Sequence, residues 1–393
     1  MNKSKDFIYS VLSNVMIMVL MQFLLLPIYS KSHSTIEFGN FILLLTLVNM
    51  ISPIIGNTLN NIRLINKNKD QIIESEYLFL IFMESVIVMC VTGLYSLVNE
   101  FAFIDIMFSS LWSAFLLIRC YLFVYYRLDF RFKSLFYISL VASAIMIIGG
   151  VSMYLLHTSV FVILFLSEFL MSILMIFEYK NVLKKTNIKM LNKVDFKSYL
   201  ELLSANSILN LINYSDRILL SIFLGTIYVP LFFIATIIGK ISNILINPIV
   251  TVLLSYEVDN KQEITTAQVR KTWKLIIFLS IIISIFISVL SWVFIYIFYN
   301  EYIYKVQLLI FPASLGVILM SSSALLQIKL LANNQYRNNL IINLFTLIII
   351  VLLSAILTNI IEIYGYAIAL IISAIYKHFA IYKNILKLIQ NKG

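Results

Sequence analysis

Long apolar segments separated by short polar ones run along the whole chain. A window of about 20 residues, the length that crosses a bilayer as a helix, finds twelve such segments. The first six span residues 7–29, 38–60, 77–98, 106–126, 135–156 and 159–179, and the last six span 199–224, 228–254, 272–298, 306–330, 340–357 and 365–385. The pattern predicts an all-α integral membrane protein with about 12 transmembrane helices.

A weak internal repeat groups these segments into two halves. KDFIYSVLSN at 5–14 aligns without a gap with KSYLELLSAN at 197–206, and each stretch leads into a long apolar segment. We therefore expect an N-terminal six-helix half at 1–180, a basic cytoplasmic linker at 181–198 and a C-terminal six-helix half at 199–393. Parallel repeats place a substrate site between the halves, so we expect a central cavity.

Segment 199–224 carries a polar stripe within its apolar length. Its members recur at spacings of four, three and four, and they are Asn206, Asn210, Asn213 and Arg217. These side chains fall within an arc of about 60° on one helix face. Lipid cannot solvate this face, because a central arginine costs roughly 2.5 to 3.5 kcal/mol on insertion. We expect the stripe to line a water-filled cavity, with hydrogen bonding between helices as the alternative for single asparagines.

Two other basic residues lie inside predicted spans. In segment 228–254, Lys240 shares a helix face with Asn243 and Asn247, which also indicates cavity lining. Arg119, in segment 106–126, has two equally good interpretations. It could form part of a wall that binds a sugar and phosphate ligand. It could also form a structural ion pair with Glu84, since both residues lie about 12 Å from the cytoplasmic end of their helices.

Three carboxylates inside the spans are candidates for ion coupling. Glu168 stands among apolar neighbours in the sequence, so it could bind and release a proton, and pairing with Lys240 or Arg119 is the alternative. Glu84 is the second candidate. Asp216 is the third, and because it points about 100° away from Arg217 we expect it to contact an adjacent helix.

Composition and charge indicate on which side of the membrane each loop lies. Hydrophobic residues make up 61% of the chain and charged residues 12%, against about 25% charged in soluble domains. Of the 29 Lys and Arg residues, 24 fall in alternate loops that begin with the amino terminus, whereas the other loops hold only Lys31 and Lys305. This asymmetry predicts that both termini are cytoplasmic. The net charge of +10 is thereby explained by solvated loop faces and gives no indication of nucleic-acid binding.

The motifs that are missing favour transport over catalysis. The three histidines show no metal-ligand spacing and the sequence has no GxxxxGK[ST] phosphate loop, so we expect no metal and no cofactor. The predicted external loops are all short. A membrane polymerase would need a larger one to hold its acceptor, so we do not expect an enzyme.

The run YSDRILLSIFLG at 214–225 resembles the Asp-Arg helix of the Wzx-type polysaccharide flippases, which translocate O-antigen and capsule repeat units. These flippases belong to the multidrug/oligosaccharidyl-lipid/polysaccharide (MOP) exporter superfamily. EFGNF at 37–41 and NNIRLINKNK at 60–69 are also similar to the family, whereas the usual glycine and tyrosine after Gly225 are replaced by Pro230 and two phenylalanines. The resemblance covers nearly the whole chain in helix count, loop lengths and layout.

This resemblance implies a MATE/MOP-like fold in a bacterial cytoplasmic (inner) membrane. It implies a polyprenyl-diphosphate-linked oligosaccharide as the substrate, moved by alternating access for O-antigen or capsule biosynthesis, with membrane lipids, a polysaccharide polymerase and chain-length proteins as partners. Arg217 matches the family motif directly, whereas Arg119 and Lys240 are candidates from depth and helix face alone. The alternatives are a multidrug/cation antiporter of the same superfamily and a repeat-unit polymerase.

Overall fold

The chain folds as an all-α membrane protein. The computed structural model describes residues 3–65, 74–180, 196–241, 250, 266–333 and 335–390. Every regular element in those ranges is a helix, and nine of the helices there are long and apolar enough to cross a membrane. The predicted fold class is thereby confirmed. The chain divides into two compact units, unit 1 (Met1–Asn210) and unit 2 (Leu211–Gly393), while the predicted linker at 181–198 lies mostly outside the described residues and stays a prediction.

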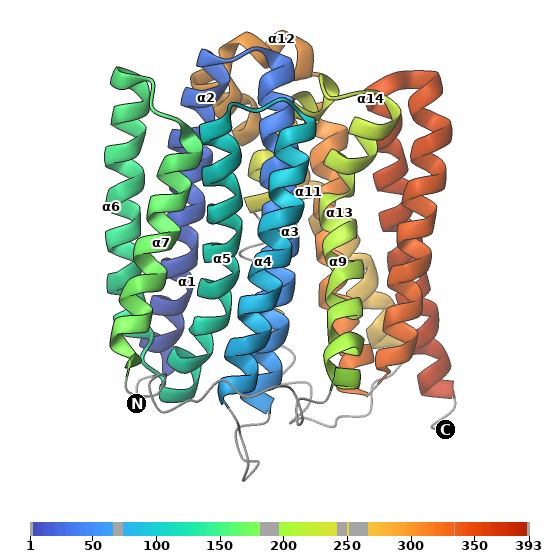
Figure 1. Cartoon of the computed structure of the whole chain (residues 1–393). Coiled ribbons are helices and arrows are strands. Elements are labelled where there is room, and N and C mark those ends of the chain that lie inside the picture. The colour runs from blue at the N-terminus through green and yellow to red at the C-terminus, as the bar shows by residue number, and fades with distance from the viewer. Residues whose placement is uncertain are drawn as a thin grey trace. The chain divides into compact units, whose positions relative to one another are not determined.

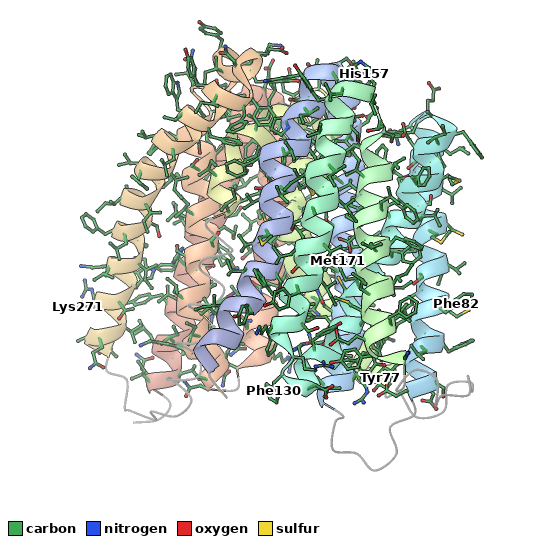
Figure 2. All side chains as sticks on the ribbon, turned by 90° about the vertical axis from the view of Figure 1, so that its left-hand side faces the viewer. Tyr77, Phe82, Phe130, His157, Met171 and Lys271 are labelled. Atoms are coloured by element: carbon green, nitrogen blue, oxygen red, sulfur yellow. The ribbon has the colours of Figure 1, made fainter. Side chains whose placement is uncertain are left out.

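In unit 1 the helices run side by side (Figure 1). They are α1 (Lys3–Leu20), η1 (Met21–Leu25), α2 (Leu26–Ser32), α3 (Thr35–Ile65), α4 (Glu74–Val98), α5 (Phe103–Asp129), α6 (Phe132–Leu156), α7 (Val160–Glu178) and the first part of α9 (Phe196–Phe223). Helix α5 packs against α3, α4 and α7, and α1 packs against α6. Figure 2 shows Tyr77 and Phe130 near one end of this unit and His157 at the other, which is the alternation expected for successive spans.

Unit 2 continues from the second part of α9. It contains a helix at Tyr228–Ile241, α11 (Thr266–Phe298), η3 (Asn300–Tyr302), α12 (Ile303–Val306), α13 (Ile310–Ala332) and α14 (Tyr336–Gln390). Helix α13 packs against α11 and α14. The predicted span 228–254 is thus helical over its first part, and most of its remainder lies outside the described residues.

Helix α14 is two helices joined by a tight turn. The backbone leaves the helical region at Ile361 and Glu362, and Glu362 has a φ of 49°. A Cβ atom on Gly365 would lie 2.2 Å from the carbonyl oxygen of Leu357, so only glycine allows the chain to pass this close. The turn confirms that residues 340–357 and 365–385 are separate spans.

The first span bends at a proline. Pro27 has no amide hydrogen, so the regular helical pattern cannot continue through it. Just before it, the Leu26 amide donates to the Met21 carbonyl oxygen, which gives the π-helical turn η1 between α1 and α2. The span therefore continues through the proline with a local change in helical pitch.

Helix α3 begins with a capping box. The Glu37 carboxylate accepts from the Ser34 amide at 2.8 Å, and the Glu37 amide donates to Ser34 Oγ at 3.3 Å. This reciprocal pair satisfies amide groups that the first helical turn leaves without partners. The sequence EFGNF at 37–41 thus marks the start of a helix that runs on to Ile65.

Large apolar side chains cover the outer faces of both units. Phe82 on α4 is 65% exposed and points away from unit 1 (Figure 2). On α11 Phe278 and Phe286 are each 63% exposed. Such continuous apolar surface is far larger than water-soluble proteins expose, and it fits contact with lipid.

Candidate functional site

The charged residues inside unit 2 form an ion pair between two helices. Lys240, on the Tyr228–Ile241 helix, donates to Asp216 Oδ2 of α9 at 2.7 Å and to the Asn213 carbonyl oxygen at 3.4 Å. The side chains of Lys240 and Asp216 are 17% and 4% exposed. Asp216 therefore contacts an adjacent helix, as expected from its direction on α9. Lys240, expected to stand as a cation in a cavity, has its charge balanced by this carboxylate.

A pocket lies beside this ion pair. It has about 340 Å³ of space outside the protein atoms, including its opening, and α9, the Tyr228–Ile241 helix, α13 and α14 line it. Asp216, Lys240, Asn213 and Ser321 are among its polar lining residues. Asp216 Oδ1 is buried and has no hydrogen-bond partner among the described residues. The pocket thus offers an ammonium group and an acceptor oxygen within one small space.

Arg217 lies next to this pair in sequence but does not line the pocket. Its side chain is buried, with the guanidinium carbon 4.6 Å from the ring centre of Phe233 and 5.2 Å from that of Tyr214. Stacking on two aromatic rings stabilises a buried guanidinium while leaving its charge in place. Arg217 is also within electrostatic range of Lys240. Two cations therefore lie close together inside unit 2, next to the carboxylate that pairs with Lys240.

A second buried ion pair connects α5 and α7 in unit 1. The Arg119 guanidinium donates to Glu168 Oε2, and the two side chains are 17% and 5% exposed. Of the alternatives for Glu168, pairing with Arg119 is the one observed, and the expectation that Glu168 stands alone is wrong. The proposed pairing of Arg119 with Glu84 is also wrong, because the partner comes from α7 rather than α4.

Glu84 instead contacts the first turns of α9. The Tyr199 hydroxyl donates to Glu84 Oε1, and Glu84 Oε2 is buried without a hydrogen-bond partner among the described residues. No salt bridge to Glu84 is present in that part of the chain. Glu84 therefore differs from Glu168 and Asp216, which both face a cation.

The asparagine stripe of α9 divides between local and tertiary contacts. Asn206 Nδ2 donates to Thr58 Oγ1 of α3 at 3.1 Å, and Asn210 Nδ2 donates to the Asn206 carbonyl oxygen of its own helix at 2.9 Å. Asn213 lines the pocket of unit 2. Asn243 and Asn247 lie outside the described residues. The shared cavity lining proposed for this stripe stays a prediction.

Several arginines of the loops are not the solvated charges that we expected. Arg63 is only 8% exposed and its Nε donates to Glu74 at 2.7 Å. Arg127 donates to the side-chain oxygens of Asn60 and Asn61, each at 2.8 Å. These contacts connect α3 to α4 and α5. The run NNIR at 60–63 holds both asparagines and Arg63 within about one helical turn, but their partners on α4 and α5 have no local signal in the sequence.

Lys377 is a further correction to the charge pattern. It is one of the 24 basic residues that the charge pattern assigns to the cytoplasmic side, yet it is 5% exposed in the second helix of α14, fifteen residues after the turn at Glu362. His378, beside it, is fully buried and its Nε2 lies 2.8 Å from the Leu319 carbonyl oxygen of α13. The interior of unit 2 is therefore more basic than the sequence indicated.

In the described residues no group of three or more His, Cys, Asp or Glu side chains could hold a metal ion.

No protein-family model matches the chain, and a search of curated proteins finds no match either. Solved structures do match. An inward-facing MATE-family multidrug resistance transporter of the MOP superfamily is 12% identical, with a TM-score of 0.70 over 99% of this chain and 96% of that one. An outward-facing MATE-family transporter is also 12% identical, with a TM-score of 0.68 over 98% and 94%.

A MOP-superfamily transporter from Pyrococcus furiosus is 13% identical, with a TM-score of 0.68 over 98% of this chain and 94% of that one. Its binding pocket is described as having reverse polarity, which suggests a different function for that protein. Identities this low establish the architecture and not the substrate. Over nearly its whole length, the chain has the fold of the MOP-superfamily transporters.

Proposed function

We propose that this protein is a flippase that moves polyprenyl-diphosphate-linked oligosaccharide repeat units across the cytoplasmic membrane for surface polysaccharide synthesis. The observation that carries the proposal is the buried pocket of unit 2, where Lys240, paired with Asp216, lies close enough to the buried Arg217 for the two positive charges to interact. Two cations buried close together in a membrane protein suit an anionic ligand, because an anion offsets the repulsion between them. The resemblance of residues 214–225 to the Wzx-type flippases agrees with this choice.

Each cation has a different role in the proposed mechanism. Arg217 is held in place by two aromatic rings, so it would act as a fixed positive centre that attracts the diphosphate. Lys240 is engaged with Asp216, so an arriving phosphate oxygen would compete with that carboxylate for the ammonium. The Asp216 oxygen released in this exchange could accept a hydrogen bond from a hydroxyl group of the sugar. Alternating access of the fold would then move the bound headgroup while the lipid tail stays in the bilayer.

The orientation follows from the loop charges in this proposal. Most loop cations fall on the side that carries the amino terminus, so both termini are placed in the cytoplasm. The substrate would therefore enter from the cytoplasmic leaflet, where lipid-linked repeat units are assembled. A polysaccharide polymerase and chain-length proteins are the proposed partners after translocation.

The test uses cells whose surface polysaccharide depends on this protein. The gene is deleted and each variant is expressed in the deletion strain. Surface polymer is measured by immunoblot, and polyprenyl-linked repeat units are extracted and quantified. Arg217→Gln should reduce export at least tenfold and cause repeat units to accumulate, while Arg217→Lys should keep part of the activity because the charge remains. Lys271→Gln, which removes an exposed cation of α11 (Figure 2), is the matched control and should export normally.

Lys240 is tested in a double variant, because replacing Lys240 alone leaves the Asp216 charge buried without its partner. We therefore compare Lys240→Gln/Asp216→Asn, which removes both charges, with the parent protein. Loss of export at normal membrane levels supports the proposal. Full export in this double variant combined with Arg217→Gln would overturn the cationic-site mechanism.

A second candidate function is multidrug export, which the fold neighbours favour because two of them are MATE-family multidrug resistance transporters. Cells that lack the protein would then keep their surface polymer and become sensitive to cationic drugs. The buried cations Arg217 and Lys240 argue against this candidate, since positive charges repel cationic drugs.

A further inference from the structure

Glu84 places a carboxylate deep in an apolar helix. It lies ten residues after Glu74 and fourteen before Val98, the two ends of α4. At about 1.5 Å per residue these intervals are roughly 15 and 21 Å, so neither end of the helix brings Glu84 close to water. Helix α4 is itself one of the candidate membrane spans.

The two oxygens of Glu84 have different surroundings. Oε1 accepts from the Tyr199 hydroxyl of α9, a neutral donor. Oε2 is buried with no hydrogen-bond partner among the described residues. The Oγ atom of the next residue, Ser85, is also buried without a partner in that part of the chain. One oxygen of this carboxylate is therefore desolvated, and none of the described residues stabilises a negative charge on it.

On α3 and α5, the cations whose side chains the structure describes near this position are engaged elsewhere. Helix α4 packs against α3 and α5. On α3, Arg63 pairs with Glu74. On α5, Arg119 pairs with Glu168 and Arg127 bonds to the side chains of Asn60 and Asn61.

The other titratable groups near this position are neutral or belong to another cluster. Cys120 of α5 is a buried thiol. The hydroxyls of Tyr121 and Tyr125 point to Glu74. On α9, Glu201 is exposed. In the described residues, Tyr199 is the single side chain that interacts electrostatically with Glu84.

An ionised carboxylate in this position would be unstable. Removing a charged group from water costs several kcal/mol even after the protein relaxes, and a partner cation must offset this cost. Glu168 and Asp216 have such partners, whereas Glu84 has none among the side chains that the structure describes. Binding a proton removes the charge at once and lets the carboxyl group keep its hydrogen bond with Tyr199.

We propose that Glu84 is a proton-binding site, occupied when Tyr199 is bonded to it and emptied by exchange of that proton with the aqueous phase. Release of the proton creates a charge that must reach water or a cation, so the contact between α4 and α9 is the part that has to change. Helix α9 runs on from Tyr199 to Asp216 and Arg217. The inference stands on unit 1 alone and holds whatever the protein transports.

Infrared spectroscopy of the full-length protein in lipid nanodiscs tests this directly. At about pH 6 exposed carboxylates are ionised, because their pKa values are near 4. A carbonyl band from a protonated carboxyl group should nevertheless be present in the parent protein. It should disappear in Glu84→Gln and shift in frequency in Tyr199→Phe, which keeps Glu84 but removes the hydrogen bond.

The ion-paired carboxylates provide the matched controls. The double variants Arg119→Gln/Glu168→Gln and Lys240→Gln/Asp216→Asn each remove an ion pair without leaving an isolated charge, and both should keep the band. Identical spectra for the parent and Glu84→Gln overturn the proposal, as does loss of the band in a control. Glutamine matches the protonated acid in size and charge, so Glu84→Gln should fold. If it does not, the Tyr199→Phe variant decides: an unshifted band there overturns the assignment of the band to Glu84.

Discussion

Replacing Glu168 should strongly destabilise unit 1, because the Arg119 guanidinium then stays buried without the carboxylate that balances its charge. The two side chains are 17% and 5% exposed, so water replaces little of the lost partner. Breaking a buried pair from one side costs about 3 to 5 kcal/mol, whereas replacing both members by neutral groups is often close to neutral. We therefore expect Glu168→Gln and Arg119→Gln to cost about 3 kcal/mol each, and the double variant to cost less than either one.

The expected shift in melting temperature follows from the size of the unit. Unit 1 ends at Asn210, and an unfolding entropy of about 2.1 cal/mol/K per residue gives about 0.44 kcal/mol/K for its roughly 210 residues. A loss of about 3 kcal/mol then lowers the melting temperature by about 7 °C. The true shift should be larger, because helices stay formed in a micelle and the unfolding entropy is smaller.

The assay is thermal unfolding of the purified protein in detergent, followed by size-exclusion chromatography after heating. All four proteins are heated at one rate, because unfolding that is irreversible depends on the rate of heating. Because each single variant should cost about 3 kcal/mol and the double variant less than that, the double-mutant cycle should show a coupling of at least about 3 kcal/mol. If the double variant melts at the sum of the two single shifts, Arg119 and Glu168 act independently and the reasoning fails.

Three further variants test the packing of the fold, each by the same melting assay. Gly365→Ala should be poorly folded, because its Cβ atom would lie 2.2 Å from the Leu357 carbonyl oxygen, and wild-type stability would show that the turn in α14 is not this tight. Gly56→Ala should cost about 1 to 3 kcal/mol, because a Cβ atom there would lie 2.7 Å from Cys120 Cβ; an unchanged melting temperature would mean that α3 and α5 can separate freely. Glu74→Gln should cost about 3 kcal/mol by leaving Arg63 buried without its partner, and a shift no larger than that of the exposed control Lys271→Gln would contradict this.

The positions of the helices could be predicted because each span is encoded locally. Residues 340–357 and 365–385 are separate apolar windows, and the polar residues Asn359 and Glu362 between them coincide with the turn that divides α14. The apolar length of a segment decides whether it spans a bilayer, whatever its neighbours are. Helix count and approximate ends therefore follow from one sequence.

The partners of the buried charges could not be predicted in the same way. Arg119, Glu84 and Glu168 each lie ten residues from the end of their helix on the same side of unit 1, so depth alone makes both carboxylates equally good partners. Rotation of each helix about its axis decides between them, and that rotation is set by packing along the whole helix. Arg119 and Glu168 are 49 residues apart in sequence, which leaves no local signal for the pair.

The pairing of Lys240 with Asp216 changes what the site in unit 2 can do. An isolated buried ammonium would hold an anion tightly, whereas Lys240 must give up one carboxylate to accept a phosphate. The exchange replaces one charged contact with another, so its net free energy is small compared with the cost of an unpaired charge. Arg217, in contact with two aromatic rings, is a second buried cation close to this pair. A proposed transporter of anionic headgroups gains from this arrangement, because a site that binds by exchange can also release by the reverse exchange.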